Sequence, residues 1–262
     1  MRWWSSCVRS ALLFLLLAPL AATAQMQAPD YNWLGAGVRT RPAYDGSAAH
    51  ETELIPSVRY FGKPWFARTT QGMLEGGARL EVNASLHLGA QIAYEGGRKS
   101  SEAEFLASRN VPDISPGASA GVHAEWDSHL GPAPTTLLAR VRQFVDTDRG
   151  SQGDLRYTVG VFGGAVSAAL FFQGTWASAK SNRSFYGVTT DVSASTGLPA
   201  YIPGGGLLYT TGGLLWEVDL SSSWIVVGNL EARLLHGAAA GSPLVERATS
   251  RYASASLAYR WR

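Results

Sequence analysis

Two histidines and one glutamate are the residues of this chain that could take part in hydrolysis. Glu125 follows His123 by two positions, and His87 lies in another stretch of alternating apolar and polar residues. Side chains two positions apart in a strand point to the same side. His123 and Glu125 would then be placed as a base and its orienting carboxylate. No spacing specifies a nucleophile beside them, so we expect no catalytic residues and no enzyme activity.

Other site chemistry also lacks a sequence signature. No cluster of cysteine, histidine or carboxylate residues has metal-ligand spacing, and no glycine-rich phosphate loop leads from a strand into a helix. Basic and acidic residues are nearly balanced, at 22 and 20. We therefore expect no metal, no cofactor and no nucleic-acid partner.

Residues 1–24 have the pattern of a secretory signal peptide. Arg2 and Arg9 supply a basic segment, an apolar run follows, and Ala22-Thr23-Ala24 is a small-x-small cleavage site. The apolar run is too short for a membrane-spanning helix. The only cysteine, Cys7, lies in this segment. The mature chain, predicted to start at Gln25, therefore has no thiol chemistry.

Strict alternation of apolar and polar residues runs through the rest of the chain, and a period of two indicates strands. In the last segment Leu257, Tyr259 and Trp261 share one face, and Ser256 and Arg260 lie on the other. Aromatic residues ending an apolar face suit a membrane interface. The sequence predicts that residues 25–262 form an all-β, transmembrane antiparallel β-barrel in contact with the outer-membrane lipid of a Gram-negative bacterium.

The alternation predicts about twelve strands. The expected spans are 31–39, 53–61, 65–71, 73–82, 84–95, 117–127, 135–145, 154–163, 165–178, 205–219, 222–235 and 250–261. Gly72, Gly76 and Gly77 blur the pattern between the third and fourth strands, so ten strands is the alternative.

Short and long connections alternate along the chain, as periplasmic turns and outer loops do in such barrels. Short turns are expected at 62–64, 83, 128–134, 163–164 and 220–222. Longer loops are expected at 40–52, 96–116, 146–153, 179–204 and 236–249. An even strand count then places both termini in the periplasm.

Ionisable residues fall on the faces that we assign to the lumen, since a lipid-facing Arg or Lys at mid-depth costs about 2–4 kcal/mol. One interpretation is a charged pore or a polar ligand site. The interpretation that we favour is an internal network of ion pairs, because buried charges must be paired. The residues expected in this network are Arg79, Glu81, His123, Glu125, Arg140, Arg142, Glu217, Glu231 and Arg233.

Three loop regions resemble the MipA/OmpV family of outer-membrane proteins over essentially the whole mature chain. They contain Pro-Ala-Tyr-Asp-Gly-Ser at 42–47, Phe-Tyr-Gly-Val-Thr at 185–189 with Gly-Leu-Pro-Ala-Tyr at 197–201, and Ser-Pro-Leu-Val-Glu at 242–246. These residues either pack the loops over the barrel mouth or recognise a partner. The motif residues are Tyr44, Asp45, Gly46, Tyr186, Gly187, Gly197, Leu198, Pro199, Tyr201, Ser242, Pro243 and Glu246.

The resemblance implies a non-enzymatic scaffold in murein synthesis. Proteins of this family are named for interaction with a murein-degrading lytic transglycosylase, which such a scaffold would hold together with a bifunctional penicillin-binding protein. The alternative is a narrow outer-membrane channel, or a surface adhesin or sensor that acts through the long outer loops.

Overall fold

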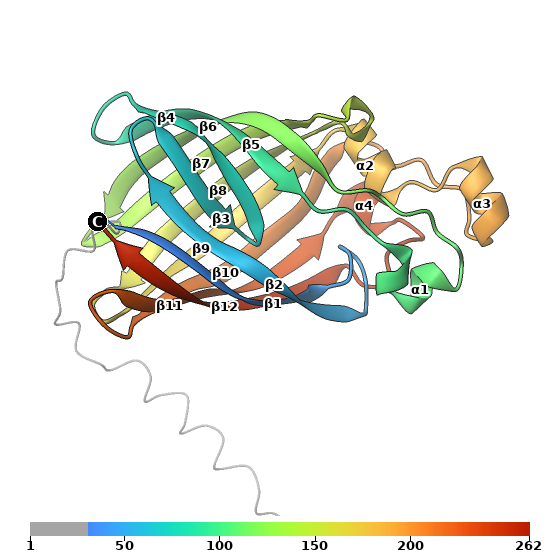
Figure 1. Cartoon of the computed structure of the whole chain (residues 1–262). Helices are drawn as coiled ribbons and strands as arrows, with labels where there is room; N and C mark the ends of the chain where they lie inside the picture. Colours follow the sequence, from blue (N-terminus) through green and yellow to red (C-terminus); the bar gives the residue numbers. More distant parts are fainter. Residues whose placement is uncertain (1–30) are drawn as a thin grey trace, which may run out of the picture.

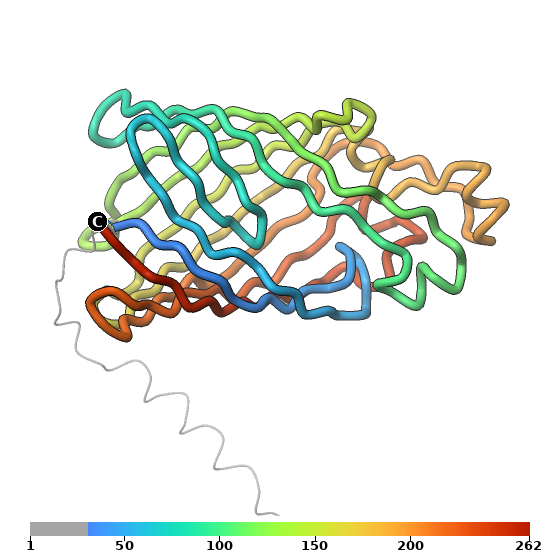
Figure 2. Tube along the Cα trace, in the orientation of Figure 1, coloured from blue at the N-terminus to red at the C-terminus, as the bar shows by residue number. Residues whose placement is uncertain are grey.

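The computed structural model describes residues 31–262, which form a barrel of twelve antiparallel strands that closes by pairing β1 with β12. Figures 1 and 2 show the strands tilted along the barrel, each beside its neighbours in sequence. The predicted twelve-stranded barrel is confirmed, and the ten-stranded alternative is wrong. The signal peptide predicted at 1–24 lies outside the described residues. The strands are β1 (Asn32–Pro42), β2 (His50–Phe61), β3 (Trp65–Thr70), β4 (Met73–Glu81), β5 (Leu86–Glu95), β6 (Gly117–Leu130), β7 (Ala133–Phe144), β8 (Ser151–Phe162), β9 (Val166–Ala177), β10 (Gly206–Asp219), β11 (Trp224–Leu235) and β12 (Thr249–Trp261).

The alternation in sequence determines which side chains face the lumen. In β12, Tyr252 and Ser256 are buried, whereas Leu257 and Tyr259 are exposed on the outer surface. Successive side chains of a strand point to opposite faces. The outer surface is therefore apolar and suited to lipid, and the polar and charged residues are gathered inside.

Several strands extend further than the side-chain pattern indicates. β6 reaches Leu130 and β7 begins at Ala133, so the turn expected over 128–134 is reduced to two residues. β1 and β2 stay paired up to Pro42 and His50, within the loop expected over 40–52. The backbone ladder continues there because its hydrogen bonds do not depend on side-chain type.

The two ends of the barrel differ. The start of β1 and the end of β12 lie at one end with the short turns, and the helices and long loops lie at the other (Figure 1). The short helical segments are Ser100–Glu102 and Thr147–Arg149, which are 3-10 helices, and α1 (Glu104–Ala107), α2 (Ala179–Tyr186), α3 (Thr190–Thr196) and α4 (Gly237–Ala240). No helix among residues 31–262 is long and apolar enough to cross a membrane.

The β3–β4 hairpin is the irregular part of the wall. Its turn is Gln71–Gly72, and both residues have positive φ, 52° and 80°. β3 has six residues, whereas β2 has twelve, and β2 pairs with β3 only over Arg59–Phe61. The hairpin accordingly stops part-way along β2 (Figure 2).

Candidate functional site

The centre of the lumen is built around Glu75 of β4, which is 2% exposed. Its carboxylate accepts hydrogen bonds from Arg68 Nε at 2.5 Å, Arg140 Nη1 at 2.6 Å and Gln91 Nε2 at 2.9 Å. Arg140 of β7 also donates to Asp154 of β8 at 2.8 Å. The ion pairs thus join the hairpin to β7 and β8, beyond β5 and β6 in the strand order. Both arginines have partners, as buried charges require.

Glu125 and the histidines lie on the periplasmic side of this centre. Glu125 pairs with Arg68 at 2.5 Å and with Arg79 at 3.0 Å. His123 packs edge-on against Phe66, with ring centroids 5.3 Å apart, and neither of its ring nitrogens has a hydrogen-bond partner. His87 Nδ1 lies 3.6 Å from Asp127. The geometry therefore places no nucleophile against His123 or His87 in the described chain.

A second set of ion pairs lies on the outer side of Glu75. Arg142 pairs with Glu95 at 3.1 Å. Arg233 donates to both oxygens of Asp45, at 2.9 and 2.7 Å, and the Tyr252 hydroxyl also bonds Asp45. Gln71, at the hairpin tip, donates to Glu231 at 2.6 Å. These contacts tie the first outer loop and the hairpin tip to the barrel wall.

Two of the residues assigned to the network from sequence lie at the periplasmic mouth. Glu81 is paired with Lys63 at 3.8 Å. Glu217 bonds the Tyr31 hydroxyl and lies 3.9 Å from Arg260. The mouth residues are therefore paired among themselves and stand apart from the centre.

Sequence reasoning missed several members of the network, above all Glu75. Its alternation is blurred by Gly76 and Gly77, so its inward direction is not evident from the pattern. Asp154 precedes the outward Leu155 by one position, a signal that could have placed it inside. Arg68 and Glu95 were missed as well. Asp45, which the sequence predicts as a motif residue, also joins the network through Arg233.

The first and third sequence motifs come together in the outer loops. The Tyr44 hydroxyl donates to the carbonyl oxygen of Leu244 at 3.0 Å, and the Ala48 amide donates to Glu246 Oε2 at 3.1 Å. The Glu246 amide in turn donates to the carbonyl of Gly46 at 2.8 Å. Gly46 has φ +107°, and a Cβ there would lie 2.9 Å from Val245, so glycine fits the crossing.

The second motif packs against the third. The Ser242 hydroxyl donates to the carbonyl of Tyr186 at 2.6 Å, and the Tyr201 hydroxyl donates to Ala238 at 2.8 Å. Gly197 ends α3 in the left-handed conformation. Leu198 packs on the apolar core of the loops, whereas Pro199 is exposed. Gly187 follows α2 where a Cβ would meet the Arg183 carbonyl at 2.4 Å, and Pro243 is half-buried.

We call this assembly of loops 43–49, 96–116, 178–205 and 236–248 the outer lid. Its apolar core includes Tyr44, Leu106, Val111, Val188 and Leu244, all buried. Burial, and then the nearby Glu246 carboxylate, raise the pKa of the Tyr44 phenol above its usual value. Burial likewise raises the pKa of Tyr186. Both phenols therefore stay neutral and donate hydrogen bonds or pack within the lid.

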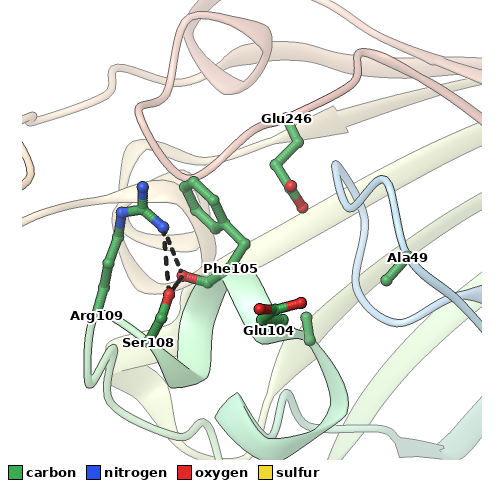
Figure 3. A pocket seen from close by; sticks show the side chains of 7 residues that line it. Ala49, Glu104, Phe105, Ser108, Arg109 and Glu246 are labelled. Carbon is green, nitrogen blue, oxygen red and sulfur yellow. Dashed lines mark hydrogen bonds between the residues drawn. The ribbon is translucent and has the colours of Figure 1, made fainter.

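A cavity of about 370 Å³ opens in the lid between α1 and the loop after β1 (Figure 3). Phe105 and Arg109 form one side, with the Arg109 guanidinium 4.2 Å from the Phe105 ring centroid. Ala49 and Glu246 lie across from them. The Glu246 carboxylate already accepts bonds from the first loop. Glu104, Ser108 and Arg109 supply the other polar groups of the lining.

Comparison with solved structures places this fold among outer-membrane barrels. The COG4313 outer membrane channel from Pseudomonas putida F1 aligns with a TM-score of 0.50 and 11% identity, over 91% of this chain and 98% of that one. A bacterial polysaccharide outer membrane secretin aligns with a TM-score of 0.44 and 9% identity, over 88% and 98%. A FadL homologue from Pseudomonas aeruginosa reaches 0.38 and 9%, over 88% and 89%. No curated protein matches the chain.

The family comparison is more direct. The family described as MltA-interacting protein MipA matches residues 34–261, from the third residue of β1 to the end of β12. Its span takes in all twelve strands and the whole outer lid. The chain is thus an outer-membrane β-barrel, and it belongs to the MipA family.

Proposed function

We propose that this protein is a non-enzymatic scaffold of the cell envelope, which holds a lytic transglycosylase and a bifunctional penicillin-binding protein beneath the outer membrane. The family description names an interaction with MltA, and the sequence motifs lie in the lid. The observation that carries the proposal is that the lid motif residues bond to one another. Their hydroxyls and carboxylates are engaged in packing the lid, which leaves the periplasmic rim as the binding surface.

The periplasmic rim offers exposed apolar side chains beside short turns. Leu130 and Phe162 end β6 and β8, and Leu220 lies in the turn after β10; all three are exposed. Lys63, in the turn before β3, is 93% exposed and only loosely paired with Glu81. Exposed apolar residues with a polar surround are typical of protein contacts. Murein enzymes act on the same side of the membrane.

Capture of purified proteins tests this function. The barrel in detergent micelles is offered to a purified lytic transglycosylase and, separately, to a bifunctional penicillin-binding protein. Leu130→Ser and Leu220→Ser should weaken capture at least several-fold, whereas Tyr201→Ala in the lid should not. Heat-modifiable migration on gels confirms that each variant has assembled.

The opposite pattern would support the second candidate, a surface adhesin or sensor. The cavity beside α1 is the observation that favours it, because a concave site on an outer loop can receive a ligand. Loss of capture in Tyr201→Ala with intact capture in Leu130→Ser would contradict the scaffold. A steady single-channel conductance would instead identify a narrow channel.

A further inference from the structure

The wall of the barrel is incomplete beside the outer half of β2, because the β3–β4 hairpin is too short to reach it. On its outer side the last β4–β5 pair is Glu75 with Ala93, and the last β2–β3 pair is Arg59 with Arg68. Residues 50–57 of β2 pair with β1 on one edge and, within residues 31–262, with no strand on the other. Eight residues span on the order of 25 Å along a strand. We call this interruption the β2 notch.

The hairpin tip does not close the notch, because it leans into the lumen. Gln71 donates to Glu231 of β11, and Met73 Sδ accepts a bond of 3.1 Å from Arg142 of β7. At Gly72 a Cβ would lie 2.2 Å from the Arg39 guanidinium, so the tip passes directly over that side chain. The tip therefore forms the floor of the notch on its lumen side.

At the start of the notch, a side chain supplies hydrogen bonds to the β2 edge in place of a neighbouring strand. The Thr69 hydroxyl donates to the Pro56 carbonyl at 2.9 Å and accepts from the Val58 amide at 3.3 Å. The N–H and C=O groups of one strand residue point to the same edge. The Pro56 carbonyl faces Thr69, so the position where proline lacks an N–H also lies on the notch side. Because Pro56 removes one donor from this edge, it disfavours the addition of another strand there. The edge is thus adapted to remain open.

The rim of the notch is apolar and its interior is polar. Leu54 is 85% exposed on the outer face of β2, and Leu74 and Tyr94 are exposed on β4 and β5. Behind them, Arg39 lies 3.6 Å from Glu53, and Arg39 Nε has no hydrogen-bond partner. The unpaired N–H and C=O groups of the β2 edge also need polar partners, because backbone groups cannot stay unsatisfied in hydrocarbon. A molecule with an acyl chain and a polar head matches both surfaces.

We propose that the β2 notch is a lateral portal for a bilayer-dissolved amphiphile. Its acyl chain lies between Leu54 and Tyr94, and its polar head enters the lumen against Arg39 and the Gln71–Gly72 tip. This binding site does not depend on the scaffold function, because it lies in the outer half of the wall, away from the periplasmic rim.

Single cysteines test the portal, since residues 31–262 contain none. Ile55 and Leu138 form a matched pair: they are 8% and 7% exposed, and both point inward. Ile55 lies behind the notch, whereas Leu138 lies on the fully paired wall between β6 and β8. Outward-facing Val38, on the strand beside Ile55, serves as the lipid-exposed reference.

The reagent is a long-chain alkyl maleimide dissolved in vesicles of phosphatidylethanolamine and phosphatidylglycerol that contain each assembled variant. Ile55→Cys should react at least ten-fold faster than Leu138→Cys and approach the rate of Val38→Cys, as measured by mass shift. Equal rates at Ile55→Cys and Leu138→Cys would overturn the portal. So would efficient oxidative cross-linking of Leu54→Cys into a dimer, because a second copy would then cover the notch.

The unsubstituted chain provides a check that needs no variant to fold. A phospholipid with a diazirine in its acyl chain is photolysed in the same vesicles, and adducts are mapped by peptide mass spectrometry. Adducts on inward Ile55 or on the tip peptide around Gln71, at several times the level on Leu138, support the portal. Adducts confined to outward side chains contradict it.

Discussion

The barrel has two unlike walls. From β6 to β12 each strand pairs with both neighbours over nearly its whole length, as Ser119–Leu130 of β6 does with β7. From β2 to β5 the backbone pairing is short, and side chains such as Thr69 and Gln71 form hydrogen bonds to other strands instead. Backbone pairing alone can therefore hold the strands of the closed wall together, whereas in the notched wall side-chain hydrogen bonds and ion pairs replace part of the missing backbone pairing.

The largest expected effect concerns the ion pairs that anchor the hairpin. Glu75→Ala leaves Arg68 and Arg140 without their shared carboxylate in a buried site. Removing one partner of a buried pair costs about 3–5 kcal/mol. Urea unfolding in lipid vesicles, followed by tryptophan fluorescence, measures the loss. The control is Glu81→Ala on the same strand: Glu81 is 53% exposed at the side chain and meets Lys63 only at 3.8 Å. Its loss should cost about 0–1 kcal/mol, and equal losses would mean that the hairpin is not held by its charges.

The next effect compares lipid-facing leucines on the two walls. Leu230 of β11 is exposed between paired neighbours, and Leu230→Arg should cost about 2–4 kcal/mol near mid-depth. Leu54→Arg should cost less, by at least about 1 kcal/mol, because the arginine can turn toward the polar notch and escape much of the mid-depth penalty. Unfolding midpoints of the two variants in one lipid decide this. Equal costs would show that the notch offers an arginine no more polar surroundings than the closed wall does.

A smaller effect is expected where a side chain replaces the ladder. Thr69→Val removes the hydroxyl that bonds Pro56 and Val58, and should lower the free energy of unfolding by about 1 kcal/mol. Thr40→Val is the control, since the Thr40 hydroxyl meets only the exposed Thr52 hydroxyl. Exposed changes of that kind usually stay within about 0.5 kcal/mol. If the two valine variants are equally stable, the Thr69 hydroxyl does not stabilise the β2 edge.

The strands of both walls could be predicted from sequence, and the bounds of β3 and β4 agree to within one residue. The notch itself and the inward direction of Glu75 could not be predicted. The alternation at Leu257, Tyr259 and Trp261 shows which side chains face lipid and which face the lumen, so strands such as β12 are evident from the sequence. Around Glu75, Gly76 and Gly77 the absence of side chains removes that signal. The lid shows a second limit. Tyr44 and Glu246 are far apart in the chain, and only the closed barrel brings them into contact.

The smallest effect concerns the lid above both walls. Tyr44→Phe removes one hydroxyl that bonds Leu244 and Glu246, and should destabilise the lid by about 0.5–1.5 kcal/mol at neutral pH. Because burial raises the pKa of Tyr44, its contribution is complete below the ordinary phenol pKa of about 10 and is lost as pH rises through the higher folded value. Protease cleavage of the outer loops should therefore rise above about pH 10 in the unsubstituted protein, and rise less steeply in Tyr44→Phe. Tyr94→Phe, on the lipid-facing side of β5, should follow the unsubstituted profile. Identical alkaline profiles for Tyr44→Phe and the unsubstituted protein would mean that the lid is held by its apolar core and not by this phenol.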